Sequence, residues 1–203
     1  FVSAASFGTH YYSGNSSVIS VTEDGLLKAV GTGETTVTVI YSWNEQVVPV
    51  KVMTPASGPV TVGNTGGIVQ GPDGHIVSFG AGQLSGDATV NISAIPASDV
   101  PVALPGYLDV AATFRLDITG ATVNGPVQLA IPVSGIPVGD TVYFFRQVES
   151  SLAGTPQTYL AAVDSGIVGA DGYVRTTSPP WPGLSSNGNI VMARANQPVR
   201  IIT

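Results

Sequence analysis

The side chains that could carry hydrolytic chemistry are few and widely spaced in this sequence. A Ser–His–carboxylate triad needs a histidine as its base, and the chain has two, His10 and His75. His75 follows a turn signal at Asp73, and His10 stands next to Tyr11 and Tyr12, so we expect both histidines to be exposed turn or edge residues. The sequence contains no Gly-x-Ser-x-Gly, His-x-x-x-His or phosphate-binding loop motif. These observations predict a protein that is not an enzyme.

The 13 acidic residues lie mostly beside glycines, where a carboxylate stabilises a turn through hydrogen bonds to the backbone. Glycoside hydrolysis would require two of them across a cleft. Calcium would require several oxygen ligands at short spacing, and the best candidate pair is Asp164 with Asp171. The chain has no cysteine, which excludes disulfides, thiolate catalysis and Cys-ligated zinc. We therefore expect no metal or cofactor to be needed.

Two aromatic groups are candidates for ligand binding. Trp181 lies in the Pro-rich segment 175–183, and Trp43 lies close to Tyr41. Proline-rich segments are extended, and a neighbouring ring can serve as a platform for a sugar. The alternative, which we favour, is that the tryptophans pack in the core, because β-sandwiches commonly bury a tryptophan between their sheets.

Composition and patterning both indicate an all-β protein. Only 10% of the 203 residues are charged, against about 25% in an average soluble domain. Val, Ile and Thr recur in short alternating runs that Gly and Pro interrupt, and no helical periodicity is present. Strands are expected at 18–22, 26–30, 35–41, 47–53, 67–69, 75–79, 88–94, 111–118, 127–131, 141–147, 159–163, 167–168, 173–177, 189–193 and 199–202. Their spacing is typical of sandwich domains.

The domain boundary is expected within residues 54–62, where prolines and a glycine cluster. This divides the chain into domains 1–56 and 57–203. The net charge of −6 and the seven scattered basic residues argue against a nucleic-acid partner, which requires a concentrated basic patch. No apolar run reaches the roughly 20 residues of a membrane helix.

Residues 15–53 resemble the group 2 bacterial immunoglobulin-like domains. The resemblance rests on the stretches Ser-Val-Ile-Ser-Val at 17–21, Asp-Gly-Leu-Leu-Lys-Ala-Val-Gly-Thr-Gly at 24–33 and Thr-Thr-Val-Thr-Val at 35–39. The opening strands of that family are not recognisable here. Residues 66–135 resemble the ZU-type β-sandwich of ankyrins, netrin receptors and bacterial surface proteins, through Gly-Gly-Ile-Val at 66–69, Pro-Asp-Gly-His-Ile-Val at 72–77 and Pro-Val-Gln-Leu-Ala-Ile-Pro at 126–132. The His-Phe-Ser self-cleavage site of some relatives does not occur in this sequence.

Together these resemblances imply two tandem β-sandwich domains, Ig-like and ZU-like, in an extracellular or cell-surface protein. The implied function is a non-catalytic structural or adhesive module whose partners are other protein domains or copies of itself. A carbohydrate-binding module that uses exposed aromatic rings, with glycans as partners, is one alternative. A subunit of a strand-exchanged extracellular filament is another.

The filament alternative depends on the two ends of the chain. An Ig-like domain without its first strands leaves a sheet edge open to another chain. The candidate donors are the apolar start, with Phe1 and Val2, and the β-branched end, with Val199, Ile201 and Ile202. Because the chain opens without a methionine, we expect it to be a piece of a longer protein.

Overall fold

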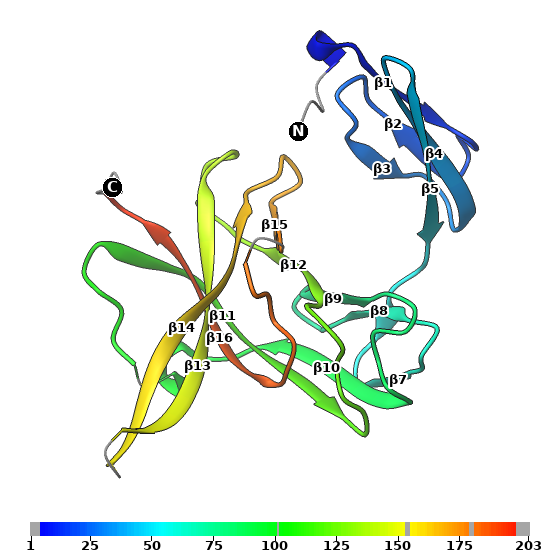
Figure 1. Cartoon of the computed structure of the whole chain (residues 1–203). Coiled ribbons are helices and arrows are strands. Elements are labelled where there is room, and N and C mark those ends of the chain that lie inside the picture. Colours follow the sequence, from blue (N-terminus) through cyan, green and yellow to red (C-terminus); the bar gives the residue numbers. More distant parts are fainter. Residues whose placement is uncertain (1–4, 101, 153–154, 179–180, 198–203) are drawn as a thin grey trace. The chain divides into compact units, whose positions relative to one another are not determined.

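The computed structural model describes residues 5–100, 102–152, 155–178 and 181–197 (Figure 1). It is 57% strand and 3% helix, which confirms the expectation of an all-β chain. The chain divides into two compact units, Phe1–Thr54 and Pro55–Thr203, which we call unit 1 and unit 2. None of the described helices is long and apolar enough to span a membrane.

Unit 1 contains two small antiparallel sheets. A three-stranded sheet has the order β1-β4-β5, and a two-stranded sheet pairs β2 with β3. The elements are η1 (Ala5–Phe7), β1 (Thr9–Ser13), β2 (Ile19–Val21), β3 (Leu27–Ala29), β4 (Gly33–Tyr41) and β5 (Asn44–Val52). Strands β4 and β5 form the longest hairpin of the unit, with Tyr41 opposite Asn44 at its turn.

The core of unit 1 is small for two sheets. Its buried residues are Val18, Ile19 and Val37, with Tyr11 and three further valines packed at the margin. The Tyr11 ring lies directly over Gly25, where a β-carbon would collide with it, so the turn before β3 requires glycine both for space and for its φ of +82°.

Unit 2 contains two larger sheets, with strand orders β14-β13-β16-β11-β10-β7 and β15-β12-β9-β8-β6. All strand pairs are antiparallel except β6 with β8, which is parallel. The strands are β6 (Ala56–Ser57), β7 (Val60–Val62), β8 (Gly67–Gln70), β9 (Ile76–Phe79), β10 (Ala88–Ala94), β11 (Leu108–Thr119), β12 (Gln128–Pro132), β13 (Thr141–Leu152), β14 (Thr155–Ile167), β15 (Tyr173–Arg175) and β16 (Gly188–Ala195). The short helix η2 (Ala97–Asp99) precedes β11.

The core of unit 2 lies between these two sheets, as in a β-sandwich. Alternate residues of each strand point inward, as the period of two requires, and in β10 the burial alternates with that period from Ala88 to Ile92. Phe114, Leu116, Phe144, Ile190 and Met192 are the large side chains that the six-stranded sheet contributes, and Val69, Val77, Leu129, Ile131 and Val174 come from the other sheet. Burial of this set supplies the main hydrophobic stabilisation of the unit.

The central strand β16 is covered on its other face as well. Ile190 and Met192 belong to the main core, whereas Val191 and Ala193 are buried on the opposite side. Two side-chain hydrogen bonds help to hold the segment between β10 and β11 near this outer face. The Thr113 hydroxyl donates to the Ile95 carbonyl at 2.6 Å, and the Asn189 amide donates to the Asp99 carbonyl at 3.2 Å.

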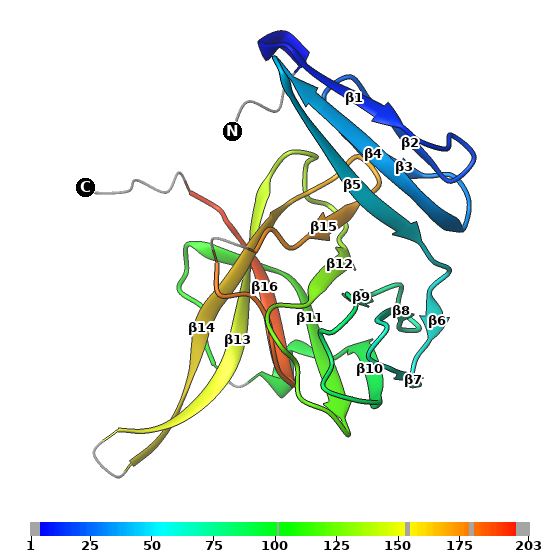
Figure 2. The same cartoon turned by 45° about the vertical axis from the view of Figure 1, so that its right-hand side comes forward.

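The hairpin β13–β14 extends beyond the rest of its sheet. Strand β13 pairs with β16 only from Val142 to Arg146, whereas its pairing with β14 continues to Leu152 opposite Thr155. The distal part is therefore a two-stranded arm, which Figures 1 and 2 show protruding from unit 2. We call residues 149–158 the arm.

Several expectations from the sequence were wrong. His75 is buried rather than exposed, since it follows the turn at Asp73 with its ring against Phe114, 5.6 Å between ring centroids. Strands β1, β6 and β7 were not expected, and β6 lies inside the proline cluster where we expected the domain boundary. The strand expected at 199–202 lies outside the described residues.

Candidate functional site

The outer face of the six-stranded sheet in unit 2 carries an apolar groove. The groove has a volume of about 460 Å³ and lies between the loop before β11 and the strands β13 and β14. Tyr107 and Leu104 come from the loop, and Tyr143, Phe145 and Leu160 come from the strands. Tyr143 and Phe145 face outward because they alternate with the buried Val142 and Phe144. The groove suits an apolar or aromatic group.

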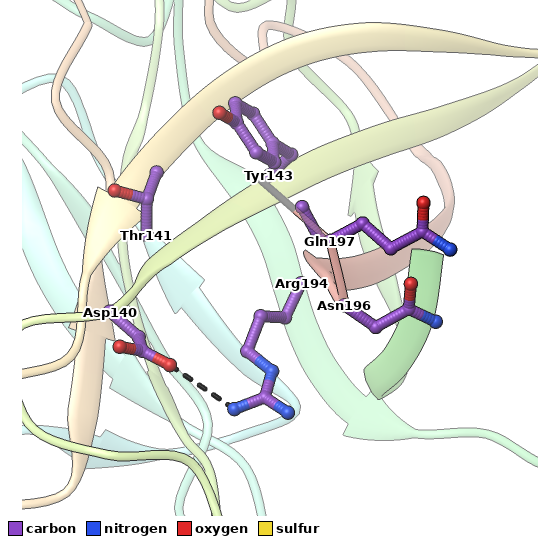
Figure 3. Close-up of a pocket in the computed structure, with 7 residues that line it drawn as sticks. Asp140, Thr141, Tyr143, Arg194, Asn196 and Gln197 are labelled. Atoms are coloured by element: carbon purple, nitrogen blue, oxygen red, sulfur yellow. Dashed lines mark hydrogen bonds and ion pairs between the residues drawn. The ribbon is translucent and has the colours of Figure 1, made fainter. Parts of the chain in front are cut away.

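A polar pocket of about 390 Å³ adjoins the groove at Tyr143, which lines both hollows. In Figure 3, Asp140 and Arg194 face each other below Tyr143, and Asn196 and Gln197 lie beyond them. Asp140 Oδ2 and Arg194 Nη1 are 3.1 Å apart, and both side chains are partly exposed. This ion pair orients the guanidinium group at the rim, where it can still donate to an acceptor on a ligand. A ligand with an apolar ring and a polar end would match the combined surface.

Trp181 lies beside this surface rather than in the core. Its ring is half-buried and meets Tyr143 edge-on, with 6.5 Å between ring centroids and an interplanar angle of 74°. Contacts of this kind fix the orientation of both rings. The structure therefore brings one of the candidate ligand-binding residues next to the groove.

Asp164 is a structural acceptor at this place. Its carboxylate is fully buried and accepts hydrogen bonds from the backbone N–H of Ser165 at 2.8 Å, from that of Thr177 at 3.0 Å and from the Ser178 hydroxyl at 2.5 Å. These bonds attach the start of the Pro-rich segment to β14. A β-bulge opposite Phe144 and Phe145 sets the position of Asp164, because there β14 has one extra residue.

Asp171, the other calcium candidate, is exposed in the turn before β15 and forms an ion pair with Arg175, 2.6 Å between Oδ2 and Nη2. The hydrogen bond from Arg175 lowers the pKa of Asp171, and the same bond raises the pKa of Arg175. Each of the two aspartates thus has its own partners. Among the described residues, no group of three or more His, Asp or Glu side chains is arranged to hold a metal ion.

The aromatic residues of unit 1 gather at one end of its three-stranded sheet. Trp43 occupies the β4–β5 turn and is 99% exposed, so the expectation of a buried tryptophan is wrong there. Tyr41, at the end of β4, and Phe7, two residues before β1, are also exposed. Thr9 pairs with Tyr41, which brings η1 and the turn to the same end, as Figures 1 and 2 show. We call Phe7, Tyr41 and Trp43 the aromatic tip.

A strained residue supports this tip. Ser42 precedes Trp43 with a φ of +54° and is the one non-glycine residue with positive φ among those described. This left-handed conformation is uncommon for a residue with a β-carbon. Phe1, Val2, Val199, Ile201 and Ile202, the expected assembly residues, lie outside the described residues.

Sequence reasoning missed the apolar groove and its polar pocket. Their residues come from four segments that are far apart in the chain, and pairing of β13 with β16 is what brings Arg194 opposite Val142 and near Asp140. The one available signal was the run Tyr-Phe-Phe at 143–145, in which an outward aromatic residue must stand on either side of the buried one.

Comparison with models of known protein families finds no match for this sequence. Comparison with curated proteins also finds no similar sequence. The resemblances to the Ig-like and ZU-type domains stay predictions from the sequence.

Proposed function

We propose that this chain is a non-catalytic structural and adhesive module of a bacterial surface or fibre protein, and that it acts outside the cell through contacts with other proteins. In this proposal its two units are an Ig-like and a ZU-like sandwich. The low charge, the many short strands and the two family resemblances support this role. Exposed apolar side chains are the physical requirement for such contacts.

The observation that carries the proposal is the aromatic tip. Trp43 is 99% exposed and contributes nothing to the core of its own unit. Tryptophan and tyrosine are enriched in protein interfaces and contribute a large share of the binding energy there. The two-residue turn between β4 and β5 places Trp43 at the end of the hairpin, where its whole ring is open to a partner.

The test compares Trp43→Ala with Val138→Ala, which removes a 66% exposed apolar residue of unit 2. Both variants and the wild type are immobilised and probed with purified extracellular matrix proteins. Loss of one aromatic anchor should weaken binding about tenfold or more, while Val138→Ala should bind like the wild type. Equal binding by all three chains would refute the role of the tip. Turnover of ester or glycoside substrates by the wild type would refute the non-catalytic role.

A carbohydrate-binding module is the second candidate, and the groove of unit 2 is the observation that favours it. Tyr107 and Tyr143 supply rings on which a sugar can stack, and Asp140, Arg194 and Asn196 supply polar groups beside them. Calorimetric titration with neutral oligosaccharides tests this candidate. If Tyr107→Ala abolishes the heat of binding and Trp43→Ala leaves it unchanged, the sugar binds in the groove.

A further inference from the structure

The two sheets of unit 1 meet along one side and are open along the other. Strands β1 and β2 close one side, where the Ser13 hydroxyl donates a hydrogen bond to the Ile19 carbonyl at 2.9 Å. Strands β3 and β5 are the last strands in their sheets on the opposite side. We call the gap between β3 and β5 the open side.

Apolar residues that face the interior of unit 1 are exposed at this open side. Val48 lies directly opposite Val37 in the β4–β5 ladder, so both side chains point to the same face of the sheet. Val37 is 4% exposed but Val48 is 41% exposed. Strands β1 and β2 help to cover Val37, but no described strand of unit 1 lies beside β5 on the side of Val48.

The two-stranded sheet repeats this pattern. Leu27 alternates with Ala29, which pairs with the buried Ile19, so Leu27 also faces the interior. Its side chain is 42% exposed. Val48 of β5 and Leu27 of β3 thus leave inward apolar surface uncovered on the same side, whereas Val50 and Val52, further along β5, pack against the core. Among the described residues, this is the geometry of a sandwich with room for one more strand beside Val48.

The end of the chain has the sequence to fill such a gap. Residues 198–203 read Pro-Val-Arg-Ile-Ile-Thr, in which Val199 and Ile201 are two apart and would share one face of a strand. Six extended residues span about 20 Å, enough to follow most of β5. Arg200 adds a positive charge to this segment, whereas residues 1–54 carry four acidic and two basic side chains. The electrostatic interaction between the segment and unit 1 is therefore attractive.

Hydrogen bonds anchor the chain to unit 2 shortly before segment 198–203. The backbone N–H of Asn196 donates to the Tyr107 carbonyl at 3.0 Å. The side-chain amide of Asn196 donates to Asp109 at 2.9 Å. These bonds hold Asn196, which follows β16, against the loop and strand of β11. The segment 198–203 therefore begins two residues after a fixed point of unit 2.

We propose that the open side of unit 1 binds residues 198–203 of a second copy as an added β-strand. Val199 and Ile201 cover Val48 and Leu27, and the backbone pairs by β-augmentation with the edge of β5 that no described strand occupies. The contact joins the end of one copy to the start of the next and does not close, so it generates chains of copies. This proposal names the partner of the structural module proposed above and rests on that role.

Two matched variants test the binding side. Val48→Lys places a charge on the interior face of β5, whereas Val47→Lys places one on the outward face at a similar exposure, 46%. An inward charge is a natural block to edge pairing. Sedimentation of the 1–203 chain should show assemblies that grow with concentration for the wild type and Val47→Lys, and monomers for Val48→Lys. Leu27→Lys, which places a charge on the interior face of the two-stranded sheet, should also give monomers.

A labelled peptide Pro-Val-Arg-Ile-Ile-Thr tests the donor directly. Fluorescence anisotropy should show binding to a chain without residues 198–203, and a lysine at Val48 should weaken it at least about tenfold, since a charge would be buried without a partner. Val47→Lys should leave the affinity unchanged, and a peptide with Asp in place of the residue corresponding to Ile201 should not bind. Circular dichroism checks that each variant keeps its strands.

Three results would overturn the proposal. These are a wild-type chain that stays monomeric up to about 1 mM, association that survives removal of residues 198–203, and a peptide that binds the Val47 and Val48 variants equally. Each result refutes strand exchange but leaves the adhesive role to be judged by the Trp43 experiment, and enzymatic turnover would refute that role whatever the state of association.

Discussion

The Ser178 hydroxyl donates a hydrogen bond of 2.5 Å to the fully buried carboxylate of Asp164. The same carboxylate accepts the backbone N–H of Thr177. Two consecutive residues of the Pro-rich segment are thus bound to one side chain of β14, and the Thr177 N–H donates in addition to the Ser165 carbonyl at 3.1 Å. Hydrogen bonds to a charged acceptor are stronger than those between neutral groups, so this contact adds to the backbone bond from Gly183 to Val163 in holding the segment that bears Trp181.

Asp164→Ala should destabilise unit 2 by about 2–4 kcal/mol, because it removes a fully buried carboxylate with three hydrogen bonds and leaves the buried Ser178 hydroxyl without its acceptor. Urea unfolding followed by circular dichroism measures the change. Asp171→Ala is the matched control. It breaks an exposed ion pair with Arg175, which solvent screens, so the loss should stay below about 1 kcal/mol. Similar losses for the two variants would contradict the structural role of Asp164.

His75 should make unfolding depend on pH. Burial of the ring lowers the pKa of His75 below its ordinary value of 6.5, and the nearby Asp73 carboxylate only partly offsets this. The unfolded chain therefore binds a proton at a pH where the folded chain does not. Stability is complete above pH 6.5 and falls as the pH drops below that value, by at most about 1.4 kcal/mol per pH unit for one proton.

The measurement is the free energy of unfolding between pH 7 and pH 5. His75→Phe should flatten this part of the profile, because phenylalanine keeps an aromatic ring beside Phe114 and cannot titrate. His10→Gln, at an exposed position of β1, should keep the slope of the wild type. A slope that disappears with the His10 change instead would place the titrating group in unit 1.

Gly71→Ala should be among the most damaging single changes in unit 2. A β-carbon at Gly71 would fall on the backbone carbonyl oxygen of Ile92 in β10, and a backbone atom cannot move aside as a side chain can. We expect a loss of about 2–4 kcal/mol. Gly86→Ala, where a β-carbon meets open space, is the control. Thermal unfolding of both variants decides the matter, and a small effect at Gly71 would show that β8 and β10 are less closely packed.

Local patterning predicted some elements well and others poorly. Residues 88–94 were expected as a strand and form β10 with the same bounds, because their alternation is visible in the sequence. Strand β1, with His10 and two tyrosines, has no aliphatic alternation and was missed. Its pairing with β4 is a long-range contact that no local pattern reports.

The site was harder to predict than the fold. His75 was misjudged because the preceding turn signal says where the backbone reverses but not which side of the strand faces the core. Trp43 was misjudged because a core role for tryptophan is the general rule, and its exposure follows from its place in a two-residue turn. The groove needs the register of β13 against β16, which depends on packing across the whole sheet.

The arm at residues 149–158 should be dispensable for folding. Its described residues, 149–152 and 155–158, pair only within the β13–β14 hairpin, and an isolated two-stranded ribbon contributes little stability in water. Replacing residues 149–158 by Asn-Gly, which favours a tight hairpin turn, joins the facing pair Val148 and Tyr159 directly. The free energy of unfolding should change by less than about 1 kcal/mol. A large loss of stability would mean that the arm packs on the body of unit 2, while an unchanged fold with lost binding to a matrix protein would assign the arm a role in adhesion.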